Sequence, residues 1–208
     1  LNSESGNIYI VTAFCEEGNL SKALEKAGGK LSVGKSLKVL ADISNAFCEI
    51  EALKLRDSSG NTLTMMHRDL KPENILMDEG NAILADFGFA KFIAEQIKEE
   101  QVIQTMVGTV LYMSPQLLQK QAYSYKTDIW SMGIMTYELM FGTTPWDSTT
   151  TVKLLHGIKN VPLSFPEDVP EEVQDLLKKM LSVEEKPRPD WKEIMEHPAV
   201  QKYAEREQ

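Results

Sequence analysis

Apolar positions in the first quarter of the chain predict one strand followed by two helices. Residues 7–15, Asn-Ile-Tyr-Ile-Val-Thr-Ala-Phe-Cys, are rich in β-branched and aromatic side chains, which is typical of a buried strand. Apolar residues then recur at helical spacing over residues 20–27, and Gly28-Gly29 ends that pattern. A longer amphipathic pattern over residues 33–50 predicts a second helix.

The middle of the chain combines short apolar runs with polar loops. Residues 56–62 have the composition of a polar loop. Residues 75–77 and 82–85 are predicted strands, because Asp78-Glu79-Gly80-Asn81 between them is typical of a hairpin turn. Residues 89–115 have no clear period, so we expect a long irregular segment, and such loops are usually functional or disordered.

The last third of the chain is predicted to be helical. Residues 129–141 are apolar almost all round, so we expect a buried helix there. Residues 149–158 predict a shorter helix, and Pro170 begins another whose first turn is acidic and whose end carries lysines. A last helix starts over residues 191–195, and we expect Pro198 to end it. The pattern predicts an α+β protein that is mainly α, with short β-hairpins.

Composition narrows the class of protein. The 208 residues predict one domain or two small ones, and 42% apolar and 25% charged residues are ordinary for a globular protein. A net charge of -9 argues against nucleic acid as a partner and mildly favours basic partners, although an acidic surface kept for solubility is the better explanation. Cys15 and Cys48 show neither a disulfide framework nor a metal spacing, and we expect a cytoplasmic location. The longest apolar run is short, so no signal peptide and no membrane partner are expected.

Two motifs carry recognisable chemistry. The block His67-Arg68-Asp69-Leu70-Lys71-Pro72-Glu73-Asn74 is followed, twelve residues beyond its end, by Asp86-Phe87-Gly88. A lone Asp-Phe-Gly is weak evidence, but the block, the predicted hairpin and the tripeptide together are specific. Over residues 7–197 the chain resembles the eukaryotic protein serine/threonine kinases, and its later helices are similar to the calmodulin-dependent and autophagy-initiating groups.

The resemblance implies a protein-kinase-like C-lobe, in which a helical bundle surrounds a central buried helix. Residues 1–18 then correspond to the last N-lobe strand and the hinge, and residues 19–208 to the C-lobe. The catalytic loop would span residues 67–74 and the activation segment residues 86–116. No Gly-x-Gly-x-x-Gly occurs in the sequence, so we expect a fragment without the N-lobe that is inactive alone and self-associates through residues 8–14.

Phosphoryl transfer needs positioning and charge neutralisation more than covalent help. Asp69 is the candidate to accept or orient the proton of a substrate hydroxyl, while Asn74 and Asp86 carry the hard oxygen atoms that suit Mg²⁺ bound to ATP. Lys71 supplies charge for the transferring phosphoryl group, and in this family a lysine at that position marks Ser/Thr specificity. By resemblance, Thr109 bonds Asp69 and Lys71. The alternative is that these side chains merely cap turns.

The resemblance also implies regulation. Thr105 matches the usual activating phosphorylation site, which an upstream kinase or autophosphorylation would modify. Phosphate there needs cationic partners, and Arg68 and Lys91 are the matching cations. A solvated loop threonine is the alternative.

Several residues have implied structural roles. His67, Phe87 and Gly88 belong to the framework of the two motifs, and Asp128 would bond backbone amides of the catalytic loop. One motif departs from the family, which has Ala-Pro-Glu where this chain has Ser114-Pro115-Gln116. The family glutamate pairs with an arginine that corresponds to Arg188, and Gln116 could still accept a hydrogen bond without the charge attraction.

The nucleotide site would be formed by the hinge and the hairpin. Thr12 matches the gatekeeper, Ala13 and Cys15 would offer backbone groups to adenine, Asn19 matches the ribose-facing position, and Leu76 matches the apolar floor.

Substrate preference and the alternatives to a kinase remain open. Glu73 and Glu138 match acidic positions that read substrate arginine, so the protein substrate is expected to carry Ser or Thr flanked by basic residues. The alternative functions are a pseudokinase-like scaffold, which the intact Asp69, Asn74 and Asp86 speak against, and a small-molecule phosphotransferase of related fold.

Overall fold

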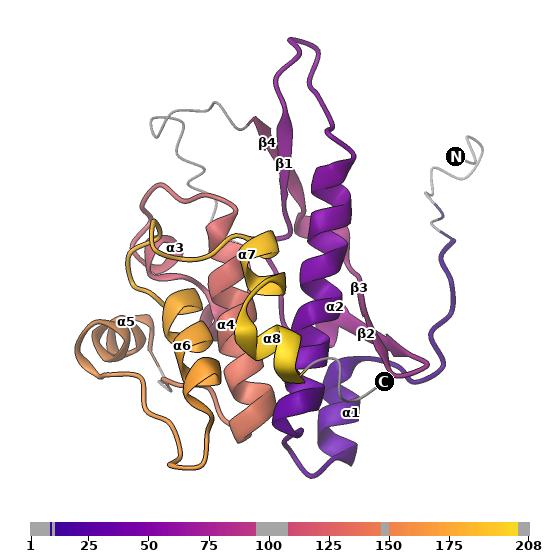
Figure 1. The fold of residues 1–208 in the computed structure, drawn as a ribbon. Helices are drawn as coiled ribbons and strands as arrows, with labels where there is room; N and C mark the ends of the chain where they lie inside the picture. Colours follow the sequence, from indigo (N-terminus) through magenta and orange to yellow (C-terminus); the bar gives the residue numbers. More distant parts are fainter. Residues whose placement is uncertain (1–8, 10, 95–107, 147–149, 204–208) are drawn as a thin grey trace.

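The computed structural model describes Tyr9 and residues 11–94, 108–146 and 150–203, which form a helical body with two small β-sheets (Figure 1). The helices are α1 (Leu20–Lys26), α2 (Val33–Ala52), α3 (Pro115–Leu118), α4 (Lys126–Phe141), α5 (Thr151–Asn160), α6 (Glu171–Met180), α7 (Trp191–Met195) and α8 (Pro198–Tyr203). The predicted α+β class with mainly α content is confirmed. None of the helices in these residues combines the length and hydropathy needed to cross a bilayer.

Both sheets are antiparallel pairs of short strands. Strand β1 (Leu63–Met66) pairs with β4 (Lys91–Ala94), and β2 (Ile75–Asp78) pairs with β3 (Asn81–Leu84) across the predicted hairpin turn. The 3₁₀ turns η1 (Pro72–Asn74), η2 (Phe87–Phe89) and η3 (Val110–Tyr112) complete the regular elements. Because β4 returns to β1 after the β2–β3 hairpin, the two sequence motifs are folded toward each other.

Helix α4 is buried almost completely, as its sequence predicts. Nearly every side chain over residues 127–140 is inaccessible to solvent, which only a helix surrounded by protein can achieve. Helices α2 and α6 pack against it (Figure 1). Phe47 of α2 stacks on Trp191 of α7 with ring centroids 4.1 Å apart, so the C-terminal helices are held against α2.

The strand predicted for residues 7–15 is wrong where the structure describes it. Tyr9 and residues 11–15 form no strand, and Val11 and Phe14 are 95% and 85% exposed. Strand composition alone does not make a strand, because the backbone needs a neighbour to accept its hydrogen bonds. Within the described part of the chain, no strand pairs with this segment.

Two further expectations need correction. The segment 89–115 is not wholly irregular, because β4 lies within it and pairs with β1 across more than twenty intervening residues. Pro198 begins α8 instead of ending α7, because proline is well tolerated in the first turn of a helix. Helix α7 ends at Met195 after starting with a capping box between Asp190 and Glu193.

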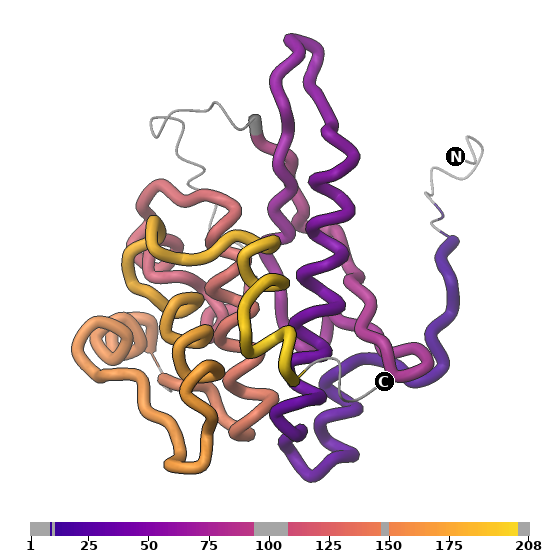
Figure 2. Tube along the Cα trace, viewed as in Figure 1, coloured from indigo at the N-terminus to yellow at the C-terminus, as the bar shows by residue number. Residues whose placement is uncertain are grey.

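A narrow arm projects beyond the end of α2. After Ala52 the chain turns through Leu53 and Lys54, which has φ of 48°. Arg56 then forms an isolated bridge with Thr62, and the Leu63 amide donates to the Leu55 carbonyl at 2.8 Å. Asp57 organises the tip, because its carboxylate accepts hydrogen bonds from two backbone amides. Figure 2 shows this arm standing clear of the helical body.

Candidate active site

The catalytic loop at residues 67–74 is held by the first turn of α4. The carboxylate of Asp128 accepts the backbone N–H of His67 at 2.7 Å and that of Arg68 at 2.9 Å. Arg68 has a left-handed backbone with φ of 70°, which is unfavourable for a bulky side chain. The two hydrogen bonds compensate for that strain, so a buried carboxylate fixes the turn that presents Asp69.

Burial raises the pKa of the Asp128 carboxyl to about 6, while the two backbone N–H donors and the charge of Arg68 act in the opposite direction. The side chain is fully inaccessible, so desolvation of the charged form outweighs these hydrogen bonds. Asp128 therefore combines the bonding role expected from the sequence with a titration near neutral pH.

His67 connects the two motifs. Its Nε2 donates to the Ala85 carbonyl at 2.9 Å, and its ring meets the ring of Phe87 edge-on at 5.5 Å. Burial lowers the pKa of His67, although the Ala85 hydrogen bond and the charges of Asp69 and Asp86 raise it. The imidazole is therefore neutral at pH 7, and it ties the residue before Asp86 to the catalytic loop.

Three side chains converge around the Asp69 carboxylate. Lys71 Nζ donates to Asp69 Oδ2 at 2.8 Å and to Thr109 Oγ1 at 3.1 Å, and the Thr109 hydroxyl lies 3.4 Å from Asp69 Oδ1. Asn74 Nδ2 donates to the Asp69 carbonyl at 2.8 Å and to Oδ2 at 2.9 Å. A carboxylate fixed in this way can accept a proton from a hydroxyl placed beside it, and the lysine supplies nearby positive charge.

The predicted metal ligands are an amide and a carboxylate. Both amide hydrogen bonds of Asn74 come from its nitrogen, so its Oδ1 is bonded to no described residue. Asp86 is exposed, and its Oδ1 accepts the Gly88 amide at 3.2 Å while Oδ2 makes no hydrogen bond with the described residues. The Asn74 carbonyl accepts the Ala85 amide at 3.1 Å, which brings the two positions close in the fold.

These two oxygen donors fit Mg²⁺, which usually takes one or two protein ligands and fills its shell with phosphate and water oxygens. The described residues contain no cluster of three or more His, Cys, Asp or Glu that could hold a metal by itself. The donor set therefore suits a cation that arrives with a phosphate group.

Gly108 was not singled out as a site residue from the sequence, although the structure makes it critical. Its φ is 107°, and a Cβ there would lie 2.6 Å from the Arg68 carbonyl oxygen and 3.6 Å from Asp69 Oδ1. Only glycine allows the chain to pass so close to the catalytic loop. The signal in the sequence was a glycine directly before Thr109.

The hinge residues are only partly brought to the site. Asn19 and Leu76 form an isolated bridge, and the Met77 amide donates to the Gly18 carbonyl at 2.8 Å. Asn19 Oδ1 accepts the Lys22 amide and its Nδ2 lies 3.4 Å from the Glu73 carbonyl, so one end of the side chain caps α1 and the other contacts the catalytic loop.

The other three predicted nucleotide residues precede that bridge. Thr12 and Ala13 are exposed and Cys15 is half-buried. Figure 2 shows this indigo segment leading away from the body, so the structure does not bring Thr12 and Ala13 to Asp69.

The predicted cations lie beside the catalytic loop. Arg68 Nε donates to the Phe89 carbonyl at 2.6 Å and its side chain bonds Tyr123, while Lys91 is exposed on β4 opposite Met66. Thr105 lies outside the described residues.

Arg188 is buried and fully engaged. Its Nη2 donates to Gln116 Oε1 at 2.7 Å, while its other nitrogens reach backbone carbonyls, including that of Ser182 at 2.9 Å. The guanidinium also lies over the Trp130 ring, 5.0 Å from its centroid. Burial lowers the pKa of Arg188 to about 10, so it stays charged at pH 7. The glutamine amide also donates to the Val183 carbonyl at 2.9 Å, which a glutamate could not do.

Comparison with known proteins identifies the family of the chain. A family model described as the protein kinase domain matches residues 1–200. The chain is 31% identical to the serine/threonine-protein kinase atg1 of Dictyostelium discoideum over 194 residues, which is 91% of this chain and 27% of that protein. It is 28% identical to Aurora kinase C of Mus musculus over 200 residues, which is 96% of this chain and 67% of that protein.

The serine/threonine-protein kinase Nek2 of Homo sapiens is 30% identical over 195 residues, which is 93% of this chain and 43% of that protein. The chain belongs to the eukaryotic serine/threonine protein kinase family. It spans only about a quarter of the length of atg1.

Proposed function

We propose that this chain supplies the catalytic loop of an ATP- and Mg²⁺-dependent protein serine/threonine kinase. The observation that supports it best is the network in which Lys71, Asn74 and Thr109 all bond Asp69. Three partners fix the direction of one carboxylate, and positioning is what phosphoryl transfer requires.

In this proposal, the substrate hydroxyl oxygen attacks the γ-phosphorus of ATP, the bond from that phosphorus to ADP breaks, and the hydroxyl proton goes to Asp69. Lys71 stabilises the negative charge on the transferring group. Asn74 Oδ1 and the free oxygen of Asp86 would hold Mg²⁺, which neutralises phosphate charge when bound. Asp128 and His67 keep this loop in place.

The chain by itself is proposed to turn over little. Its sequence holds no Gly-x-Gly-x-x-Gly, and Thr12 and Ala13 lie on an exposed segment, so few groups would cover the nucleotide phosphates. We also propose that the exposed apolar side chains of that segment favour self-association.

The test is a phosphoryl-transfer assay with labelled ATP on a longer polypeptide that adds a glycine-rich loop to this chain. Asp69→Asn and Asp86→Ala should each lower the initial rate by about 100-fold or more, because each removes a proposed role in the transition state. Asp168→Asn, at an exposed aspartate in the connection between α5 and α6, is the matched control and should keep the rate. Equal rates in all four proteins would exclude these roles and leave the scaffold alternative.

A preference for basic substrates is proposed from two glutamates. Tyr112 donates its hydroxyl to Glu138 Oε2 at 2.6 Å, and burial raises the pKa of Glu138, with the nearby charge of Glu73 adding to the effect. Two carboxylates whose charges act on each other also attract a cationic side chain. A peptide library should therefore select Arg or Lys next to the target residue, and selection without such enrichment would remove the idea.

We further propose that phosphorylated Thr105 pairs with Arg68 and Lys91. Lys91 begins β4 and Arg68 follows β1 by two residues, so a phosphate carrying roughly -1.5 to -2 charge near the start of β4 would find hydrogen-bond donors. Hydrogen exchange should slow in residues 89–94 and 108–115 after phosphorylation. Equal exchange in both forms would refute the pairing.

A further inference from the structure

A small groove lies between the ends of α5 and α6, on the opposite side of the molecule from the β2–β3 hairpin (Figure 1). Its volume is about 260 Å³. The floor is formed by buried apolar side chains, among them Trp146, Ile158 and Leu181. The Trp146 indole donates to the Val161 carbonyl at 3.0 Å, and its ring stacks on Trp130 at 5.7 Å, so the floor is fixed in position.

Two lysines flank this floor. Lys159, at the end of α5, donates to Gln119 Oε1 at 2.6 Å, and Lys178, near the end of α6, lies 3.4 Å from Gln174 Oε1. Both side chains are exposed, and neither forms an ion pair with any residue that the structure describes. Lys178 Nζ also lies 5.4 Å from the centroid of the Phe165 ring, a contact that leaves its charge without a carboxylate partner. Neither lysine charge is neutralised by a described carboxylate, so both can attract an anionic group.

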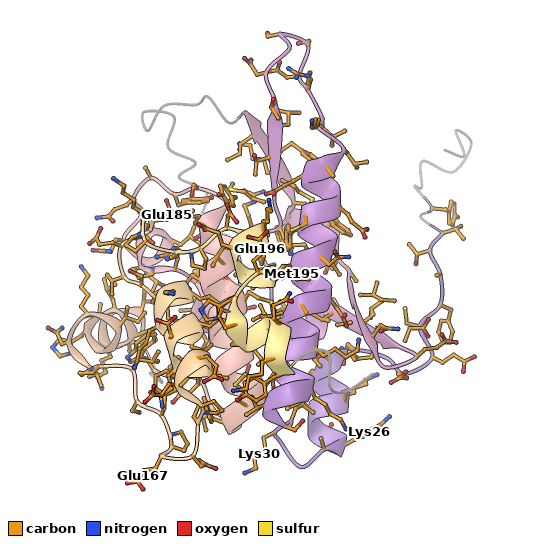
Figure 3. The ribbon with its side chains drawn as sticks, in the orientation of Figure 1. Lys26, Lys30, Glu167, Glu185, Met195 and Glu196 are labelled. Carbon is orange, nitrogen blue, oxygen red and sulfur yellow. The ribbon has the colours of Figure 1, made fainter. Side chains whose placement is uncertain are left out.

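The charge of the groove is opposite to that of the chain. The chain carries a net charge of -9, yet the residues that line the groove include two lysines and no carboxylate. The connection between α5 and α6 does contain acidic residues, but Figure 3 shows Glu167 at its outer turn, away from α5. An acidic ligand thus meets local attraction at the groove and repulsion elsewhere, which favours this position.

The rim offers exposed apolar surface as well. Val161 is 52% exposed beside the floor, and Pro162 next to it is also exposed. Covering these side chains removes apolar area from water. The groove is below the roughly 300–1,000 Å³ of typical small-molecule sites, so its size suits one anchoring side chain of a larger partner.

We propose that this groove docks a partner protein through an acidic peptide segment. One large apolar side chain enters between Trp146 and Leu181, and carboxylates on either side of it reach Lys159 and Lys178. The surface is separate from the loop that carries Asp69, so docking here goes beyond the proposed phosphoryl transfer and needs no nucleotide.

The probe is a fluorescein-labelled nine-residue peptide with a central tryptophan flanked by glutamates, titrated against the 208-residue chain by fluorescence anisotropy. Double reversal, Lys159→Glu with Lys178→Glu, should weaken binding by about tenfold or more, and added salt should weaken it in the wild type. Lys35→Glu with Lys186→Glu gives the same change in net charge at exposed sites outside the groove and should bind like wild type.

A second pair of variants separates the apolar contribution from folding. Val161→Asp should weaken the peptide by about tenfold, whereas Val152→Asp, at a residue of α5 that is 79% exposed, should not. The Val161 group that bonds the floor is its backbone carbonyl, which Val161→Asp retains, so both variants should unfold at similar temperatures. Any of four results would overturn the proposal. These are equal affinity for a peptide with lysines in place of glutamates, unchanged binding by the double variant, no binding at all, or preference for anionic lipid vesicles.

Discussion

At the scale of single residues, the catalytic loop and the Asp-Phe-Gly motif combine backbone strain with close approach of the chain. Arg68 and Asp86 both adopt left-handed backbone conformations, with φ of 70° and 59°. Each is stabilised by a specific hydrogen bond, from the Arg68 amide to Asp128 and from the Gly88 amide to Asp86. Such conformations persist only where neighbouring groups determine them, so substitutions beside these residues should have larger effects than burial alone suggests.

Replacing Gly108 by alanine tests this idea directly. The added Cβ would lie 2.6 Å from the Arg68 carbonyl oxygen, at a φ of 107° that alanine disfavours. We expect Gly108→Ala to lower the free energy of unfolding by about 2–4 kcal/mol, measured by urea denaturation.

Gly28→Ala is the matched control, because Gly28 also has positive φ, 81°, but nothing within 4 Å of an added Cβ. This control should cost about 1 kcal/mol, which reflects backbone strain without a collision. If the two variants were equally stable, the close approach of residue 108 to the catalytic loop would contribute nothing to the free energy of unfolding.

At the scale of elements, Arg188 joins three parts of the helical body. It bonds Gln116 at the start of α3, the Lys126 carbonyl at the start of α4, and the turn that follows α6. A planar guanidinium is suited to such divergent acceptors, and an ammonium group is not.

Arg188→Lys should therefore lower the free energy of unfolding by about 2–4 kcal/mol, because several buried carbonyls lose their donor. Thermal and urea unfolding will measure this change. Arg56→Lys, at an exposed arginine with one hydrogen bond to the Gly60 carbonyl, should change stability by less than about 0.5 kcal/mol. A similar loss in both variants would mean that burial and geometry at Arg188 contribute nothing special.

The link between α4 and the catalytic loop should depend on pH. The pKa of Asp128 is raised by burial from 3.8 to about 6, so the folded state binds a proton more tightly than the unfolded state. The resulting stabilisation is full below pH 4 and is lost as the pH rises through 6.

Comparison with Asp128→Asn isolates this effect, because asparagine does not titrate. From pH 4 to pH 7, the unfolding free energy of the wild type should fall relative to that of the variant by up to about 3 kcal/mol. Parallel stability curves for the two proteins over this range would contradict the raised pKa.

At the scale of the whole molecule, local patterns predicted more of the fold than long-range pairing did. The apolar spacing of α2 and the all-round apolar composition of α4 found both helices within a few residues, because each pattern reflects the burial of one continuous element. The β1–β4 pair was missed, since its four-residue strands are recognisable only through each other. The strand predicted for residues 7–15 failed for the reverse reason, because residues 11–15 have a strand-like composition but pair with no strand in the described part of the chain.

The candidate site was anticipated to a similar extent. The resemblance to protein kinases implied that Thr109 would bond Asp69 and Lys71, and in the structure distances of 2.8–3.4 Å join these three side chains. Asn19 shows the limit of such reasoning, because only the structure reveals that backbone groups of α1 and of the catalytic loop contact both ends of its side chain. Contacts between the side chains of known motifs can be anticipated from the sequence, whereas hydrogen bonds that backbone groups make to the same side chains cannot.

Self-association is the prediction that belongs to the molecule as a whole. Tyr9, Val11 and Phe14 are 70%, 95% and 85% exposed, which leaves three large apolar side chains of one segment in water. Sedimentation velocity should show a sedimentation coefficient that rises with concentration, and Val11→Ser with Phe14→Ser should reduce this rise. Val152→Ser, at an isolated exposed valine, is the control. A clean monomer at high concentration would count against the idea.

The arm beyond α2 has a practical consequence. Its tip, Ser58-Ser59-Gly60, is exposed, and its backbone is organised by Asp57 from within the turn instead of by the helical body. A short epitope or a fluorophore-accepting peptide inserted between Ser58 and Ser59 should therefore leave the core intact. Such a label would report on the orientation of the domain in an assembly without touching the phosphoryl-transfer residues.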